Sequence, residues 1–348
     1  MPLVSILIPV IRTEWLNQAI RSAVNQTCKD IEIIISDDTP GDSVEKVVSV
    51  WRDARIKYFK NPKQGQSGTN RDYIISLAQG EYIKHLFDDD FLYPHSVEML
   101  LAMLRGTPFK LAFHSRDVVN SDGQIIGRPR FRIEDGNGLI KKLQRKSTQL
   151  LERLLPFRHS TYSQKDFLTV SPEYFYANMI AQLANHVGEP TNIMFHSETF
   201  RGMADPYSVN GVPMRFLSDV ALYATFVNAG HGIIGTSKVG SAYRKHDQQT
   251  SNESSPRFSA GLFEWEVNAR HACDLGYLSL DQLSGLRERL LALYQQYVQA
   301  FPELQVFIDL PPVTPGMLSL DEPTRLAVRY AHELIDQRIA ERRLKPKS

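Results

Sequence analysis

Residues 3–9 read LVSILIP, an apolar run that ends at a proline. Runs of this kind are typical of a strand that is covered on both faces, as in a parallel sheet. Residues 14–27 then carry apolar side chains at helical spacing, and residues 31–35 read IEIII, a second apolar run that leads into Asp37 and Asp38. The opening of the chain therefore predicts a strand, a helix and a second strand.

The same alternation continues to about residue 105. We predict the following elements: helix 43–52, strand 56–59, helix 66–79, strand 81–87 and helix 95–104. Alternating strands and helices predict an open α/β sheet with right-handed crossovers, in which ligands bind beyond the carboxyl ends of the strands. Polar side chains stand at these ends, with Arg12 after the first strand, Asp38 after the second, and aspartates at 88–90 after the fourth. This convergence predicts a ligand site.

The pattern becomes less regular beyond residue 110. We predict strands at 111–119, 124–127 and 192–196, and helices at 138–155, 172–187 and 216–229. Helix 138–155 is basic on one face, which indicates a solvated surface, with a lid or a membrane-surface contact as the alternative. Three more helices, at 257–275, 280–300 and 321–343, predict a helical C-terminal region.

The composition excludes several classes of protein. The chain has 348 residues, 42% of them hydrophobic, and a formal net charge of +1, which gives no electrostatic reason to expect nucleic acid as a partner. Its two cysteines, Cys28 and Cys273, are far apart, so we expect reduced thiols rather than a disulfide framework or a cysteine zinc site. The short apolar run at the start lacks a basic region before it and predicts a buried strand rather than a signal peptide. We therefore expect a cytoplasmic protein, with a peripheral contact to the inner face of the membrane left open.

Three adjacent aspartates after an apolar strand need a physical reason, because neighbouring like charges repel one another without a cation. Mg²⁺ and Mn²⁺ prefer carboxylate oxygens and keep water or phosphate oxygens as further ligands. Asp88, Asp89 and Asp90 therefore indicate a site for a divalent ion. The alternative, strongest for Asp90, is that this carboxylate caps the helix that begins near Pro94.

Two further residues are candidates for chemistry. Asp219 opens a predicted helix and could act as a general base, or it could simply stabilise the helix start through the helix dipole. His246, in the segment YRKHD, is a candidate metal ligand, although a lone histidine is more often structural or exposed.

These residues, taken in order, resemble the inverting family-two glycosyltransferases with the GT-A fold. The resemblance is carried by VSILIP at 4–9, AIRSAVNQT at 19–27, EIIISDD at 32–38, and GEYI at 80–83 followed by the aspartates and Pro94. It covers roughly residues 3–105, with a weaker match over 188–251. The chain departs from the family pattern at three positions: Phe87 replaces the first aspartate of the common motif, Asp72 replaces an asparagine, and Ser218 replaces a frequent glutamate.

The resemblance implies roles for individual residues. It implies that five residues contact the nucleotide: Pro9, Arg12, Asp38, Arg71 and Asp88. It also implies that Asp89 binds the metal, with Asp90 and His246 as further candidate ligands. Asp219 matches the general base. The implied domains are a nucleotide-sugar-binding half at 1–105, an acceptor-binding half at 106–254 and the helical region at 255–348.

We therefore predict a metal-dependent inverting glycosyltransferase that uses Mn²⁺ or Mg²⁺ and a UDP- or dTDP-linked sugar. The acceptor would be a hydroxyl of a glycan, a lipid-linked sugar or a protein, in bacterial polysaccharide, glycolipid or protein glycosylation. One alternative is a sugar nucleotidyltransferase, which usually has a glycine-rich loop after the first strand, where this chain reads VIRTE at 10–14. The other is a protein that binds nucleotide sugars without catalysis. For the helical region, a homodimer interface, an acceptor platform and a membrane contact all stay open.

Overall fold

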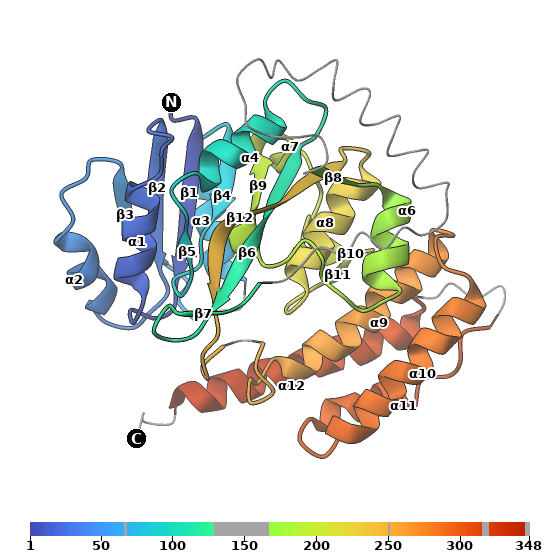
Figure 1. Cartoon of the computed structure of the whole chain (residues 1–348). Helices are drawn as coiled ribbons and strands as arrows, with labels where there is room; N and C mark the ends of the chain where they lie inside the picture. Colours follow the sequence, from blue (N-terminus) through green and yellow to red (C-terminus); the bar gives the residue numbers. More distant parts are fainter. Residues whose placement is uncertain (66–67, 129–166, 250, 315–319, 345–348) are drawn as a thin grey trace. The chain divides into compact units, whose positions relative to one another are not determined.

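The computed structural model describes residues 1–65, 68–128, 167–249, 251–314 and 320–344 (Figure 1). The contacts divide the chain into two compact units. The first, here called the sheet unit, comprises residues 1–171, 186–204 and 229–246. The second, here called the helical unit, comprises residues 172–185, 205–228 and 247–348. The predicted helix 138–155 lies outside the described residues, and the functional division at residues 105 and 254 stays a prediction.

The sheet unit is built on one mixed sheet. Its strands are β1 (Val4–Val10), β2 (Ile31–Asp37), β3 (Ile56–Lys60), β4 (Tyr82–His85), β5 (Phe91–Leu92), β6 (Leu111–Val119), β7 (Ile125–Gly127), β8 (Phe167–Val170), β9 (Ile193–His196) and β12 (Ile233–Arg244). The main order is β3-β2-β1-β4-β9-β6-β12-β5, with β7 beside β6 and β8 beside β12. Strands β1 to β4 pair in parallel, as do β6 and β12, whereas β9 runs antiparallel to both its neighbours. The predicted, mainly parallel α/β sheet is therefore confirmed.

Helices cover both faces of this sheet. The sheet unit contains α1 (Leu16–Val24), α2 (Ser43–Ser49), α3 (Thr69–Leu77), α4 (Ser96–Leu104) and α7 (Ser197–Arg201). Every second residue of β1, beginning at Val4, belongs to one apolar cluster with buried residues of α1, α2 and α4. Helix α3 is absent from that cluster and lies on the opposite face (Figure 1). Because strand side chains alternate between faces, an apolar strand such as β1 is stable only when both faces are covered.

The long strand β12 is not predicted from the sequence. Its residues, IIGTSKVGSAYR, contain two glycines and several polar side chains, which disfavour a strand by propensity. The reason for the glycines lies in the neighbouring strand β6. A Cβ atom at Gly235 would stand 2.1 Å from the ring of Phe113, and one at Gly240 would stand 2.3 Å from the ring of His114. The glycines therefore make room for buried rings, and the strand that results carries Arg244 and His246 towards the aspartates.

Other elements differ from the sequence prediction in detail. The helix predicted at 172–187 is shorter and consists of α6 (Pro172–Tyr174) followed by the π-helix η2 (Phe175–Ile180). Leu183 then has a φ of 54°, in the left-handed region that ends a right-handed helix. Strands β5 and β8, of two and four residues, are not predicted from the sequence either.

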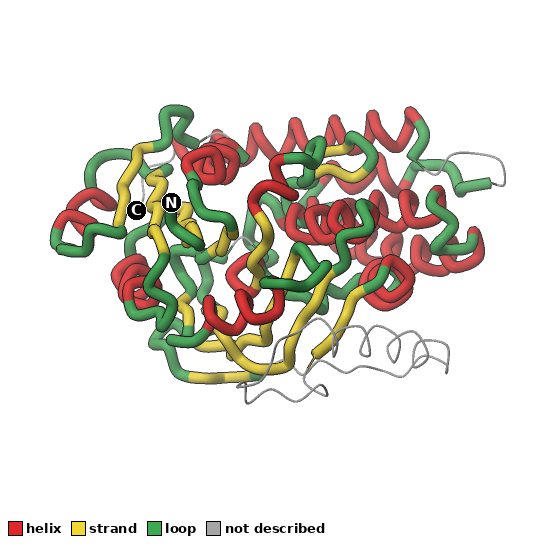
Figure 2. The backbone as a smooth tube through the Cα atoms, turned by 90° about the horizontal axis from the view of Figure 1, so that it is seen from above, coloured by secondary structure: helices red, strands yellow, loops and turns green. Residues whose placement is uncertain are grey.

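The helical unit contains the predicted C-terminal helices. They are α9 (Phe258–Asp274), α10 (Leu280–Tyr297) and α12 (Glu322–Leu344), with η4 (Pro302–Leu304) and α11 (Gln305–Ile308) between them. The unit also holds α8 (Ser218–Asn228) and the hairpin of β10 (Ser208–Val209) and β11 (Val212–Pro213). Figures 1 and 2 show α9 running beside α10 and α12. Among the described residues, no helix combines the length and the apolar character needed to cross a bilayer.

Buried carboxylates are a recurring feature of the helical unit. Glu264, Glu266 and Glu303 are each fully buried, and each accepts hydrogen bonds from partners distant in sequence. Arg270, Arg287 and Tyr294 all donate to Glu266. Both cysteines are free thiols, as predicted.

Candidate active site

The site is positioned by the adjacency of β1 and β4. These two strands pair in parallel through residues 4–7 and 82–85, so the segments that follow them emerge at the same edge of the sheet. Strand β2 lies on the other side of β1, which makes this a point where the strand order reverses direction. Arg12 and the aspartates at 88–90 meet here, as the sequence predicts.

Asp88 fixes the loop after β1. Its Oδ2 accepts hydrogen bonds from the backbone N–H groups of Ile11 at 2.8 Å and Arg12 at 2.9 Å. Burial, together with the charge of Asp89, raises the pKa of the Asp88 carboxyl to about 7. One carboxylate oxygen is thus committed to the backbone of the first loop, so Asp88 holds the two segments of the site together.

Asp89 and His246 converge on one nitrogen of Arg12. Arg12 Nη1 lies 3.0 Å from Asp89 Oδ2 and 2.8 Å from His246 Nε2. Because a guanidinium can only donate, Arg12 is the donor in its contact with the Asp89 carboxylate. Asp89 Oδ2 and His246 Nε2 are 3.1 Å apart, and the histidine ring packs at 4.5 Å against the ring of Trp15. Asp89 and His246 therefore lie side by side, with the Arg12 guanidinium in contact with both.

Asp90 is the most enclosed of the three aspartates. It is 1% exposed, its Oδ1 accepts from the backbone N–H of Arg244 at 3.0 Å, and its Oδ2 accepts from the Thr191 hydroxyl at 2.6 Å. Burial and the charge of Asp89 raise the pKa of Asp90 well above its ordinary value. The alternative that Asp90 caps the next helix is wrong, because α4 begins after His95 and has no side-chain cap. The carboxylate instead connects β4 to β12 and to the turn at Thr191.

Arg244 is a site residue that the sequence analysis missed. Its side chain is almost fully buried and donates to the Asp89 carbonyl oxygen at 2.8 Å and to the carbonyl oxygens of Asn120 and Ser121. It also donates to Gln18 in α1 and lies 5.2 Å from the Trp15 ring. The nearness of Arg244 to His246 in the sequence could have indicated a place in the site. Its contacts could not be predicted, because its partners come from three distant segments of the chain.

The residues predicted to bind the nucleotide base lie along the carboxyl ends of β1 and β2. Pro9 stands opposite Ser36, and the backbone N–H of Asp38 donates to the Val10 carbonyl oxygen. Asp38 Oδ1 accepts from Asn61 Nδ2 at 2.6 Å and from the Gly65 N–H at 3.0 Å. The carboxylate of Asp38 is therefore fixed in place by the segment that follows β3.

Asp37 and Arg71 are occupied by other partners. Burial alone would raise the pKa of the Asp37 carboxyl, but hydrogen bonds from Lys60, Thr39 and Tyr58 hold that pKa below its ordinary value. This aspartate therefore stabilises the end of β2. Arg71, on α3, pairs with its neighbour Asp72 at 3.1 Å.

Asp219 belongs to the helical unit. It lies in the first turn of α8, as predicted, and is partly buried. Its Oδ2 accepts from Asn185 Nδ2 at 2.7 Å and its Oδ1 accepts from the Val220 N–H at 2.8 Å. Both interpretations of this residue, a general base and a helix-start carboxylate, agree with these contacts.

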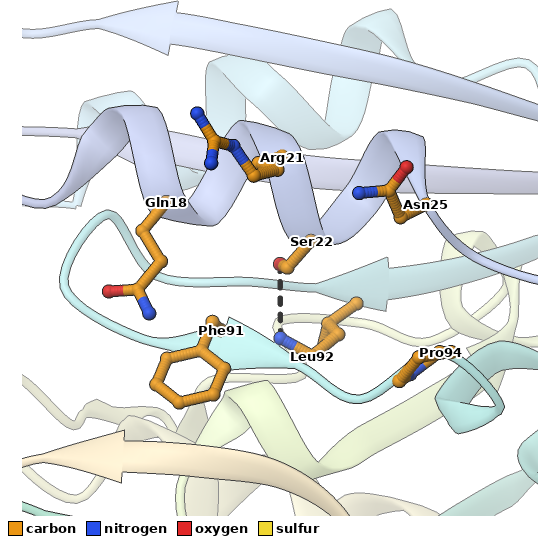
Figure 3. Close-up of a pocket in the computed structure, with 7 residues that line it drawn as sticks. All are labelled: Gln18, Arg21, Ser22, Asn25, Phe91, Leu92 and Pro94. Atoms are coloured by element: carbon orange, nitrogen blue, oxygen red, sulfur yellow. Dashed lines mark hydrogen bonds between the residues drawn. The ribbon is translucent and has the colours of Figure 1, made fainter. Parts of the chain in front are cut away.

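A pocket of about 220 Å³ lies between α1 and the segment after Asp90. Figure 3 shows its lining residues, which are Gln18, Arg21, Ser22, Asn25, Phe91, Leu92 and Pro94. The Ser22 hydroxyl accepts from the Leu92 N–H at 3.0 Å and ties the two walls together (Figure 3). None of the residues predicted from the sequence lines this pocket.

Comparison with known proteins agrees with this geometry. Residues 5–168 match the model of glycosyl transferase family 2. The chain is 32% identical over 143 residues to an uncharacterized glycosyltransferase of Rickettsia conorii, which corresponds to 40% of this chain and 24% of that protein. It is 41% identical over 106 residues to the GalNAc(5)-diNAcBac-PP-undecaprenol beta-1,3-glucosyltransferase of Campylobacter jejuni, over 29% of this chain and 34% of that protein. The chain therefore spans less than half the length of these relatives.

The fold is also found in a solved structure. The crystal structure of Staphylococcus aureus TarS residues 1–349 with UDP-GlcNAc superposes with a TM-score of 0.50 at 13% identity, covering 97% of this chain and 89% of that one. At this identity the likeness concerns the fold. The chain thus resembles family-two glycosyltransferases in sequence over residues 5–168, and it resembles the TarS structure in fold over almost its whole length.

Proposed function

We propose that this chain, whose residues 5–168 match glycosyl transferase family 2, transfers a sugar from a UDP- or dTDP-linked donor to a hydroxyl acceptor in bacterial glycan synthesis. The observation that carries the proposal is the convergence of Asp89, Arg12 and His246 where β1 and β4 end side by side. Cationic and metal-ligating groups at the carboxyl edge of a parallel sheet suit a diphosphate.

The residues fit a divalent cation with few protein ligands. Adjacent ligands of an octahedral ion with bonds of 2.0–2.1 Å stand about 3.0 Å apart. Asp89 Oδ2 and His246 Nε2 are separated by 3.1 Å, and each lies within 3.0 Å of Arg12 Nη1, so a positive group already lies beside both atoms. We propose that these two side chains hold Mn²⁺ or Mg²⁺, with the diphosphate and water completing the shell. When bound, the ion would neutralise charge on the leaving diphosphate.

The chain's own residues would then perform the remaining steps. Asp38 would accept a hydrogen bond from the base, Arg12 and Arg71 would offset phosphate charge, and Asp88 would keep the first loop in place. Asp219 would take the proton of the acceptor hydroxyl as its oxygen bonds to the anomeric carbon and the bond from that carbon to the diphosphate oxygen breaks. A single displacement of this kind inverts the anomeric configuration.

Paired aspartate substitutions test the assignment. We expect Asp89→Asn and Asp219→Asn each to abolish transfer while the midpoint of thermal unfolding changes little. Asp281→Asn is a matched control, because Asp281 also lies in the first turn of a helix, α10, and is exposed. Full transfer by either test variant, or an equal loss in Asp281→Asn, would contradict the assigned roles.

Binding measurements can identify the nucleotide sugar and the metal ion without measuring catalysis. We would measure thermal stabilisation by a series of nucleotide sugars with and without Mn²⁺, since a ligand that binds only the folded state raises its stability. Sugar release from the stabilising donor is then measured with and without glycan, lipid-linked and protein acceptors. Stabilisation without any release would indicate a protein that binds nucleotide sugars without catalysis. Release of pyrophosphate from a sugar phosphate and a nucleoside triphosphate would instead indicate a nucleotidyltransferase.

A further inference from the structure

The helical unit contains a buried carboxylate that holds the start of the helix carrying Asp219. Glu264, in the middle of α9, is fully buried. Its Oε1 accepts from the backbone N–H of Arg215 at 2.7 Å, and its Oε2 accepts from those of Phe216 at 3.0 Å and Leu217 at 2.7 Å. These three consecutive N–H groups immediately precede α8, whose second residue is Asp219.

The segment before α8 is also held by contacts on either side of Glu264. The ring of Phe216 packs over Gly261, one turn earlier on α9, where an added Cβ atom would stand 2.8 Å from that ring. The side chain of Arg215 pairs with Asp336 and donates to the His332 carbonyl oxygen, both in α12. His332 Nε2 in turn lies 3.2 Å from Glu264 Oε1. Residues 215–217 are therefore held in place by contacts with side chains and backbone of α9 and α12.

A carboxylate suits this task better than other side chains. It offers two acceptor oxygens and no donor, so it can accept from all three N–H groups of residues 215–217, which lie before α8 and donate to no carbonyl oxygen within that helix. Burying such a charge is costly unless it is fully hydrogen-bonded, and the cost makes any other backbone arrangement of residues 215–217 unfavourable. The direction in which α8 begins is thus determined by Glu264.

We infer that Glu264 is a positioning residue for Asp219, and that the C-terminal helices serve the reaction by fixing the backbone from which this carboxylate projects. The inference rests on the proposed function, in which Asp219 is the general base. Asn185, which donates to Asp219 Oδ2, orients the carboxylate itself, and Glu264 orients the helix that bears it. A displacement of about 1 Å at a catalytic group can lower the rate a hundredfold, so a loosened helix start should be visible in kcat.

The test uses Glu264→Gln in the full chain, with Glu303→Gln as its matched control. Both glutamates are fully buried in the helical unit, but Glu303 accepts from Ser259 and Arg338 rather than from the start of α8. A glutamine keeps the shape of the side chain while replacing one acceptor with a donor. For Glu264→Gln we expect a fall in kcat of at least about tenfold with an unchanged KM for the donor, and faster hydrogen exchange at the amides of 215–217. For Glu303→Gln we expect neither effect.

The possible results separate the two proposals. A kcat for Glu264→Gln within twofold of the control, while Asp219→Asn is inactive, would overturn the inference and leave the proposed function standing. Full transfer by Asp219→Asn would overturn the assigned base, and with it the inference. If Glu264→Gln does not fold, His332→Gln removes one contact to the same carboxylate, and it should lower kcat in the same way; an unchanged kcat there would overturn the inference.

Discussion

The replacement of Gly240 by alanine tests whether β12 depends on its glycines. The added Cβ atom would stand 2.3 Å from Cδ2 and 2.6 Å from Cγ and Nε2 of His114, well below van der Waals contact. The ring cannot move freely, because its Nε2 lies 2.7 Å from the Ser96 hydroxyl and its Nδ1 lies 3.0 Å from the Ser115 carbonyl oxygen. Overpacking of a core costs about 1–3 kcal/mol, and losing one of these hydrogen bonds adds about 1 kcal/mol. The intrinsic gain of alanine over glycine, about 0.5–1 kcal/mol, offsets only part of this.

We therefore expect Gly240→Ala to lower the free energy of unfolding by about 1–3 kcal/mol. The measurement is urea unfolding followed by circular dichroism, with hydrogen exchange of the β6 and β12 amides to locate the loss. Gly285→Ala is the matched control, because Gly285 lies in α10, is exposed, and has no atom within 4 Å of an added Cβ. There the same substitution should raise stability by about 0.8–1 kcal/mol. Equal or higher stability of Gly240→Ala than of the unaltered protein would refute the reasoning.

Three further substitutions test charged groups. Burial lowers the pKa of Lys84 to about 7, so between pH 7 and pH 10.5 the unfolded chain binds a proton that the folded chain does not. The unfolding free energy should therefore rise with pH across this window, and Lys84→Met should flatten the rise in urea midpoints measured at pH 7 and pH 9.5. In Arg244→Lys the side chain cannot keep its hydrogen bonds to both the Asn120 and the Asp89 carbonyl oxygens. We expect the unfolding free energy to fall by about 1–3 kcal/mol in urea titrations. An unchanged urea midpoint would show that Arg244 does not hold these two segments together. Arg338→Ala leaves Glu303 buried without its charge partner and should cost about 3–5 kcal/mol, measured by the same titrations, whereas a loss below 1 kcal/mol would show that Glu303 finds other partners.

Local periodicity is sufficient to predict the first half of the sheet. Strands β1 and β2 are largely apolar runs, β4 lies within the predicted strand 81–87, and β6 has the predicted bounds of 111–119. Strand β12 was not predicted because its glycines, Gly235 and Gly240, leave room for rings of β6. That reason becomes apparent only when the two strands are paired. The break in the helix predicted at 172–187 likewise depends on the local backbone at Leu183 rather than on a pattern in the sequence.

The candidate site divides in a similar way. That Arg12 meets the aspartates follows from the parallel pairing of β1 and β4, which a sequence can indicate. The contacts of the three aspartates could not be predicted, because their partners lie far along the chain: the first loop for Asp88, His246 for Asp89, and Thr191 for Asp90. The role of Glu264 could not be predicted for the same reason, because a glutamate within a helix is ordinarily expected to be exposed to solvent.

The interleaving of the two units along the chain limits how the protein can be shortened. The backbone passes between them five times, at 171/172, 185/186, 204/205, 228/229 and 246/247. A protein cut after residue 246 would keep residues 172–185 and 205–228 but lose the helices against which they fold. Such a protein would expose buried side chains such as Tyr176, whose ring stacks on that of Tyr277 in the intact chain, and it would be prone to aggregate. The C-terminal helices are thus not a detachable domain, and their contribution has to be studied by substitution within the intact polypeptide.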